Sequence, residues 1–207
     1  MAQFFSIHPE DPQPRLIRQA ADIVRAGGVI VYPTDSCYAL GCRIGDKAAV
    51  ERVREIREVD ARHHFALLCR DLAELGIYAT LDNQQFRLLK KLTPGAYAFI
   101  LRATREVPKR LQHPRRRTIG LRVPDHAVVQ ALLAELAEPL VSSTLLLPGD
   151  EVPLSDSREI RRRLERRVDL VIEGGPCGIE PTTVVDLTGD APVVTRVGKG
   201  STAALTA

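Results

Sequence analysis

Residues 33–41 (PTDSCYALG) carry the most evident chemistry in this chain. Two hydroxyls, a carboxylate and a phenol lie close together there, on Thr34, Ser36, Asp35 and Tyr38. The apolar run 28–32 before them predicts a buried strand, which ends here because proline and short polar side chains disrupt its backbone hydrogen bonds. In α/β sheets, ligands bind where strands open into loops. Such groups can bind a small amino acid or phosphate oxygens, and an ordinary strand-ending turn is the alternative interpretation.

The same segment resembles the Pro-Thr-Asp-Thr-x-Tyr-Gly-Leu signature that opens the YrdC/YciO family. The resemblance extends from Phe4 to about Gly198 and is strongest to the YciO branch. This family includes the threonylcarbamoyl-AMP synthases, which use ATP, threonine and bicarbonate to make the activated intermediate for threonylcarbamoyladenosine in tRNA. The resemblance implies that Thr34 and Tyr38 bind the threonine-type substrate. It also implies ATP and Mg²⁺ as possible ligands, with no permanently bound cofactor.

A basic segment at 56–65 (IREVDARHHF) matches the phosphate-gripping run of the synthases, Lys-x-Arg-Pro-x-x-Lys-Pro-Leu. Three positions differ from that pattern: Val59, Asp60 and His63. The resemblance assigns phosphate binding to Arg57 and His63, with Arg62 as a partial compensation. Cations offset the charge of phosphates, so the altered positions predict a weaker grip on ATP. Two surface histidines, His63 and His64, are the alternative interpretation.

Residues 120–124 (GLRVP) place Arg122 at the end of a predicted strand. A guanidinium there can point into a cleft and bind phosphate, or it can pair with a carboxylate. The Arg-x-Pro match to the family implies that Arg122 contacts the nucleotide. A structural salt bridge is the alternative.

Residues 141–149 (VSSTLLLPG) match the Ser-Ala-Asn region of the synthases. Thr144 keeps a hydroxyl at the serine position, so the resemblance assigns it to nucleotide binding. Leu146 replaces the asparagine and cannot form a hydrogen bond. Ser142 and Ser143 are further polar candidates, with Ser142 assigned to the substrate. The alternative interpretation is that the hydroxyls of Ser142 and Ser143 are satisfied by hydrogen bonds at the end of the strand and bind no ligand.

Two further matches lie near the end of the chain. Thr182 corresponds to the serine of the family's Ser-Thr-Val-Val-Asp, and Arg196 to the arginine of its Leu-Arg-x-Gly. The resemblance therefore assigns Thr182 to the substrate and Arg196 to the nucleotide. Ala98 stands where the relatives have a threonine, which is another loss on the ATP side of the site.

Arginines gather in two places, at 115–117 and in a predicted helix over 156–167. Family members carry a basic surface that suits tRNA or double-stranded RNA, which makes RNA a predicted partner. The RNA-binding candidates are Arg115, Arg116, Arg117, Arg162 and Arg166. Only five Phe and four Tyr are scattered through the chain, so backbone and shape recognition is favoured over base stacking. Ordinary solvated charged faces are the alternative.

The composition sets the class of protein. The chain has 207 residues with 44% hydrophobic and 27% charged residues, which is typical of one globular domain. We expect a domain over 1–200 and a loose tail over 201–207. Without an 18-residue apolar run or a signal-peptide pattern, no membrane partner and a cytoplasmic location are expected. Four cysteines without a Cys-x-x-Cys pair predict reduced, structural thiols and no metal site.

The elements that must position these residues alternate between helices and strands. Helices are predicted over 15–26, 72–76, 84–92, 126–136 and 156–167, and another is predicted to begin after Asp46. Asp46, Asp71, Asp82 and Asp125 are the expected N-caps. Strands are predicted over 29–32, 65–69, 97–101, 118–123, 139–143, 168–172, 182–187 and 192–197. This order predicts a single-domain α/β fold, an open twisted mixed sheet with flanking helices of the YrdC-like kind.

Two functions fit these observations. One is an enzyme, a nucleotidyltransferase resembling threonylcarbamoyl-AMP synthase, which also binds RNA. The other is an RNA-binding protein or a hydrolase that acts on threonylcarbamoyladenosine in tRNA and has a degraded ATP site. The altered positions lie on the ATP side, whereas the threonine-side loop is better kept.

Overall fold

The computed structural model describes residues 1–60 and 63–205. Eleven strands in these ranges form one mixed sheet, in the order β1-β9-β2-β3-β8-β4-β7-β6-β10-β11, with β5 paired to β6. The strands are β1 (Gln3–Ser6), β2 (Ile30–Tyr32), β3 (Ala39–Arg43), β4 (Ala66–Leu68), β5 (Ala79–Thr80), β6 (Tyr97–Ala103), β7 (Thr118–Arg122), β8 (Leu140–Thr144), β9 (Leu170–Glu173), β10 (Thr183–Asp186) and β11 (Val193–Arg196). The predicted α/β class with an open mixed sheet is confirmed.

Helices flank this sheet in the described part of the chain. They are α1 (Pro14–Arg25), α2 (Lys47–Arg57), α3 (Leu72–Tyr78), α4 (Asn83–Leu92), α5 (Ala127–Leu136) and α6 (Ser157–Leu164). The predicted N-caps of α2, α3 and α4 are confirmed, because each aspartate accepts a hydrogen bond from the third residue of its helix: Asp46, Asp71 and Asp82. Asp156 caps α6 in the same way.

The predicted cap of α5 is wrong. Its N-cap residue is His126, which makes no capping hydrogen bond with its side chain. The backbone N–H of Asp125 instead donates to the Asp35 carboxylate at 2.9 Å. A side chain from the loop after β2 therefore fixes the entry into this helix.

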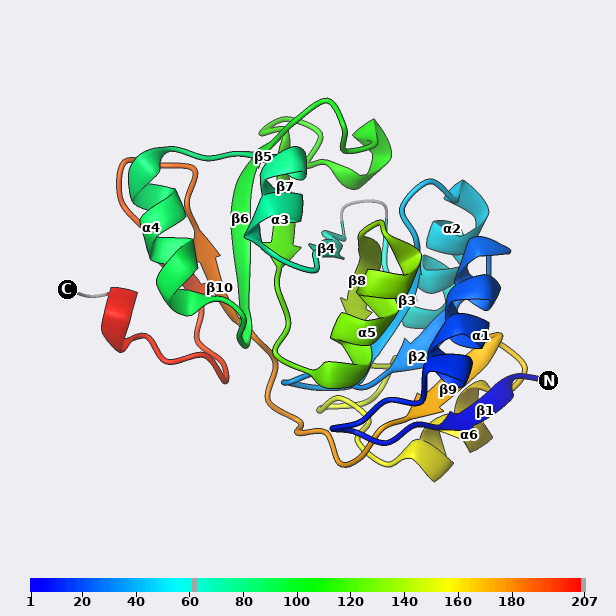
Figure 1. Cartoon of the computed structure of the whole chain (residues 1–207). Coiled ribbons are helices and arrows are strands. Elements are labelled where there is room, and N and C mark those ends of the chain that lie inside the picture. The colour runs from blue at the N-terminus through cyan, green and yellow to red at the C-terminus, as the bar shows by residue number, and fades with distance from the viewer. Residues whose placement is uncertain (61–62, 206–207) are drawn as a thin grey trace.

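Hydrophobic cores lie on both faces of the sheet because alternate strand residues point to opposite sides. Ile30 and Tyr32 of β2 pack in one core with α1 and α5, whereas Val29 and Val31 pack in the other with α2, α3, α4 and α6. Figure 1 shows α1 and α5 side by side on one face. The twist of the sheet carries β6, β7 and β10 away from these two helices.

Three strands were not predicted: β1, β3 and the two-residue β5. β3 folds back antiparallel onto β2 and pairs with β8 on its other side. Residues 33–38 therefore connect two buried neighbouring strands. At the other end of the chain, residues 201–205 include the 3₁₀ turn η2 (Ala203–Leu205), and Leu205 packs against the core. This described part of the expected tail is thus attached to the domain.

Candidate functional site

A cleft of about 610 Å³ opens on the sheet where α1 and α5 do not cover it. Its floor includes one row of paired residues that crosses four strands: Ile100, Gly120, Ala66 and Ser142. Residues that pair in this way lie on the same face of the sheet. Because three of the four side chains are small or absent, the floor leaves room for a ligand.

One end of the cleft is built around Ser143, which is 6% exposed. Arg57, the last residue of α2, donates from Nη1 to the Ser143 hydroxyl at 2.7 Å and also to the Thr144 carbonyl. The Nε2 atom of His63 lies 3.2 Å from the same hydroxyl. Burial, reinforced by the charge of Arg57, lowers the pKa of His63 to about 4. The imidazole is therefore neutral at pH 7.

The opposite end is built around Arg122, the last residue of β7. Its Nη2 atom donates to Thr34 Oγ1 at 3.3 Å and to Ser36 Oγ at 3.1 Å, and it forms an ion pair with Asp35. Burial lowers the pKa of Arg122 to about 10, so the guanidinium stays charged at neutral pH. Arg122 thus forms a salt bridge with Asp35, which was the alternative interpretation, and it also lines the cleft.

Thr182 and Arg196 lie beside each other at this end. Arg196 donates to the carbonyl of Thr182 at 3.0 Å and to its hydroxyl at 3.1 Å. Tyr38 is buried and donates to the Gly175 carbonyl at 3.2 Å, and burial raises the pKa of its phenol. The phenol is therefore a neutral hydrogen-bonding group at physiological pH.

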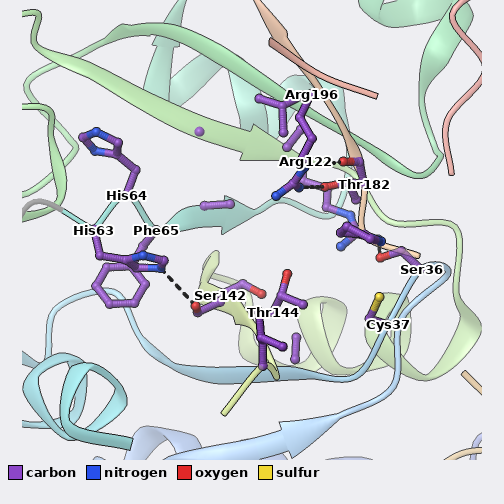
Figure 2. Close-up of a pocket in the computed structure, with 18 of the residues that line it drawn as sticks. Ser36, Cys37, His63, His64, Phe65, Arg122, Ser142, Thr144, Thr182 and Arg196 are labelled. Carbon is purple, nitrogen blue, oxygen red and sulfur yellow. Dashed lines mark hydrogen bonds between the residues drawn. The ribbon is translucent and has the colours of Figure 1, made fainter. Parts of the chain in front are cut away.

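Figure 2 shows how the predicted residues divide between the two ends. His63 and His64 lie on one side, Arg122, Thr182 and Arg196 on the other, with Ser142 and Thr144 between them. The cleft brings together nearly all the predicted substrate and nucleotide residues: Tyr38, Arg57, His63, Arg122, Ser142, Thr144, Thr182 and Arg196.

Thr34 is the exception. It is 3% exposed and does not belong to the described lining of the cleft. Its hydroxyl donates to the Cys37 carbonyl at 2.7 Å and accepts from the Ser36 and Cys37 amides. Thr34 therefore holds the shape of the loop, while Ser36 presents a hydroxyl to the cleft. The sequence could not show which of the two hydroxyls, that of Thr34 or that of Ser36, faces the cleft, because both residues belong to the same motif.

Val59 is not among the described residues that line the cleft, whereas Ala98 and Leu146 are. Leu146 thus presents an apolar side chain where the synthases are expected to have an asparagine. Arg62, predicted to compensate for lost cations, lies outside the described residues.

The two arginine runs do not form one surface. Arg116 lines the cleft and pairs with Asp186 at 2.8 Å, and its neighbours Arg115 and Arg117 are exposed. Helix α6, with exposed Arg162, and the turn after it, with exposed Arg166, lie next to β1 and β9 at a distant part of the molecule (Figure 1).

Sequence reasoning also missed the partners of these residues. Asp35 neutralises Arg122 across 87 positions of sequence, and His113 stacks on His64 with ring centroids 5.0 Å apart. No local pattern in the sequence could reveal either pair. Within residues 1–60 and 63–205, no group of three or more His, Cys, Asp or Glu side chains is arranged to hold a metal ion. None of the helices that the structure describes is long and apolar enough to cross a membrane.

Comparisons with known proteins find relatives over most of the chain. A family model for Sua5, YciO and YrdC proteins, described as telomere recombination, matches residues 22–198. The chain is 58% identical over 200 residues to the uncharacterized protein YciO of Escherichia coli K12, covering 97% of both chains. It is 32% identical over 159 residues to the threonylcarbamoyl-AMP synthase of Nitrosococcus oceani, covering 76% of this chain and 85% of that one.

Solved structures show the same fold. The crystal structure of E. coli YciO superposes with a TM-score of 0.95 at 57% identity, covering 99% of this chain and all of that one. The crystal structure of P. abyssi Sua5 complexed with L-threonine has a TM-score of 0.86 at 24% identity, covering 94% of this chain and 57% of that one. The family match over most of the chain, together with these relatives, shows that the chain belongs to the Sua5/YciO/YrdC family.

Proposed function

We propose that the cleft binds a threonine-type amino acid together with a nucleotide, and that the protein is a nucleotidyltransferase related to threonylcarbamoyl-AMP synthase. The observation that carries this proposal is the distribution of charge in one cleft. Arg57 lies at one end, Arg122 and Arg196 at the other, and a floor of small side chains separates them. A ligand with anionic groups at both ends and a neutral middle fits this pattern.

The reaction would begin when the threonine amine and bicarbonate form a carbamate and release water. A carbamate oxygen then attacks the α-phosphorus of ATP, forming the carbamoyl adenylate while pyrophosphate leaves. Such a transfer depends on positioning and on charge neutralisation rather than on a covalent nucleophile. Because the described residues hold no cluster suited to a metal ion, Mg²⁺ would enter on the ATP phosphates.

The residues divide into roles by their place in the cleft. Arg57 and Thr144 would hold phosphate oxygens at one end. At the other end Thr182, Arg196 and Ser36 would hold a carboxylate, and Arg122 would contribute the part of its charge that Asp35 does not offset. The support is geometric, because each of these side chains lines the same cleft. The chain also belongs to the family that contains the synthases.

The test is threonine-dependent release of pyrophosphate from ATP in the presence of Mg²⁺ and bicarbonate. We expect release that requires threonine and falls at least tenfold in R57Q. R25Q is the matched control, because Arg25 is an exposed arginine at the end of α1. Folded protein that releases no pyrophosphate above the threonine-free background would contradict synthase activity.

A second function is favoured by Leu146 and Ala98, which present apolar side chains to the cleft. With fewer polar groups for ATP, the same cleft would receive threonylcarbamoyladenosine of tRNA and hydrolyse it. Incubation with modified tRNA, followed by nucleoside mass spectrometry, should then show loss of this nucleoside. An unchanged nucleoside content, together with pyrophosphate release, would exclude this second function.

A further inference from the structure

The contacts of Ser143 suggest chemistry that the adenylation reaction does not use. Its hydroxyl lies at the edge of the cleft, within hydrogen-bond distance of one cation and one imidazole. A nucleophile within reach of a base is the arrangement that activates a serine. The neighbouring Ser142 differs, because its hydroxyl accepts a bond from the buried Tyr32 at 2.6 Å.

The hydrogen-bond roles follow from the donors available. The guanidinium of Arg57 has only donors, so the Ser143 oxygen must accept at the 2.7 Å contact. The one hydroxyl proton of Ser143 is then free to point at His63 Nε2, 3.2 Å away. In the tautomer with the imidazole proton on Nδ1, His63 Nε2 accepts this proton. Burial keeps the pKa of His63 at about 4, which agrees with a neutral ring.

Arg57 adds an electrostatic effect. A positive charge 2.7 Å from the serine oxygen favours the negative charge that develops when this oxygen loses its proton. The same guanidinium is tied to the Thr144 carbonyl, so it is held in position at the end of α2. Ser143, His63 and Arg57 thus supply a nucleophile, a proton acceptor and a fixed charge.

We propose that Ser143 and His63 act as a nucleophile and base that cleave an acyl or carbamoyl group bound in the cleft. The Ser143 oxygen forms a bond to the carbonyl carbon as its proton moves to His63 Nε2. The bond to the leaving group breaks, and the leaving group takes that proton. Water then attacks the acyl-serine through the same base, which restores the hydroxyl and releases the acid.

The substrate class is an ester, a mixed anhydride or a carbamoyl compound whose acyl part reaches the edge of the cleft where Arg57, His63 and Ser143 meet. The inference uses the same cleft as the proposed function but requires neither ATP nor threonine. Its success or failure is therefore independent of pyrophosphate release.

The first experiment treats the full-length protein with a fluorophosphonate probe at pH 7 and maps the adduct by mass spectrometry. We expect one adduct, on Ser143, whose rate of formation falls at least tenfold in H63Q. H64A is the matched control, because His64 stacks on His113 and lies adjacent to His63 in the chain. An adduct spread over several serines, or equal rates in the wild type and H63Q, would overturn the proposal, as would no adduct on Ser143.

A second experiment replaces Ser143 by a cysteine, which keeps a nucleophile at the same position. In S143C, Arg57 and His63 should favour the thiolate of the introduced thiol. Burial raises the pKa of Cys37 and Cys177 to about 11, that of Cys42 to about 12 and that of Cys69 well above its usual value, so the native thiols are slow to react at pH 7. We expect iodoacetamide to modify the introduced thiol at least tenfold faster than any native one. If iodoacetamide modified the introduced thiol no faster than the native ones, the result would contradict activation of residue 143 by His63 and Arg57.

Discussion

Among single residues, Arg122 and Asp35 determine how much positive charge a ligand meets at the Arg122 end of the cleft. Their side chains are only 8% and 11% exposed, and Asp35 also accepts from the Asp125 amide at 2.9 Å. A buried pair of this kind costs desolvation and contributes little net stability, whereas removing one partner leaves an uncompensated charge. Asp35 therefore holds Arg122 in place while it reduces the field that a ligand experiences.

This pairing predicts a large effect for D35N, which leaves the Arg122 charge buried without its partner. We expect the free energy of unfolding to fall by about 3–5 kcal/mol in urea denaturation. D22N is the matched control, since Asp22 pairs with Arg25 while both side chains are well exposed, and it should cost less than about 1 kcal/mol. Equal losses in the two variants would show that the buried pair has no special role.

His63 predicts a pH dependence of stability. Its pKa is about 4 in the folded protein and near 6.5 in the unfolded chain, so below pH 6.5 the unfolded state takes up a proton that the native state refuses. The contribution of His63 is complete above pH 6.5 and is lost as the pH falls toward 4. Urea denaturation at pH 7 and pH 5 should show a larger drop for the wild type than for H63Q. Burial also lowers the pKa of His64 and His126, so only the difference between the proteins isolates His63; identical drops would refute the assignment.

Among the secondary-structure elements, α5 gives a test of the backbone, because Ala137 ends this helix with a left-handed φ of 55°. An L-residue in that conformation is strained and glycine is not. A137G should therefore raise the free energy of unfolding by about 0.5–1 kcal/mol. A134G, the same change at an exposed position inside α5, should lower it by about the same amount. Chemical denaturation of both variants checks the sign, and a loss of stability in A137G would show that the strain at Ala137 is absent.

The helices were predictable at their starts because an aspartate that caps its own helix is a local signal, as at Asp46 and Asp82. The same rule failed at Asp125, which does not cap α5. Its backbone N–H instead donates to the carboxylate of Asp35, which is 90 positions away in the sequence. Strand β3 was missed for a similar reason. Its residues follow a polar turn and include Gly41, and only pairing with β2 and β8 makes them a strand.

On the scale of the whole molecule, the sheet assembles the site from segments far apart in the sequence. Motif resemblance located Arg57, Arg122 and Thr182, because each ends or adjoins a predictable element. It could not place Ser143 against His63, which are 80 positions apart and meet only when β8 and the segment before β4 are adjacent. The family resemblance implied a basic surface for RNA with arginines from both runs, whereas the fold separates the arginines of 115–117 from Arg162 and Arg166.

This separation predicts which arginines would hold RNA. Arg115 and Arg117 flank Arg116 at the cleft, whereas Arg162 pairs with Glu159 at 3.4 Å on a helix away from it. In tRNA binding measured across salt concentrations, R115A/R117A should weaken affinity and reduce the log–log salt slope by about 1.4 to 1.8, the value for two lost phosphate contacts. R162A/R166A removes the same number of charges and should change the slope less, because Glu159 already offsets one of them. If R162A/R166A instead showed the larger loss, RNA would lie against β1 and β9, and the cleft would have to act on a ligand that is not part of the bound RNA.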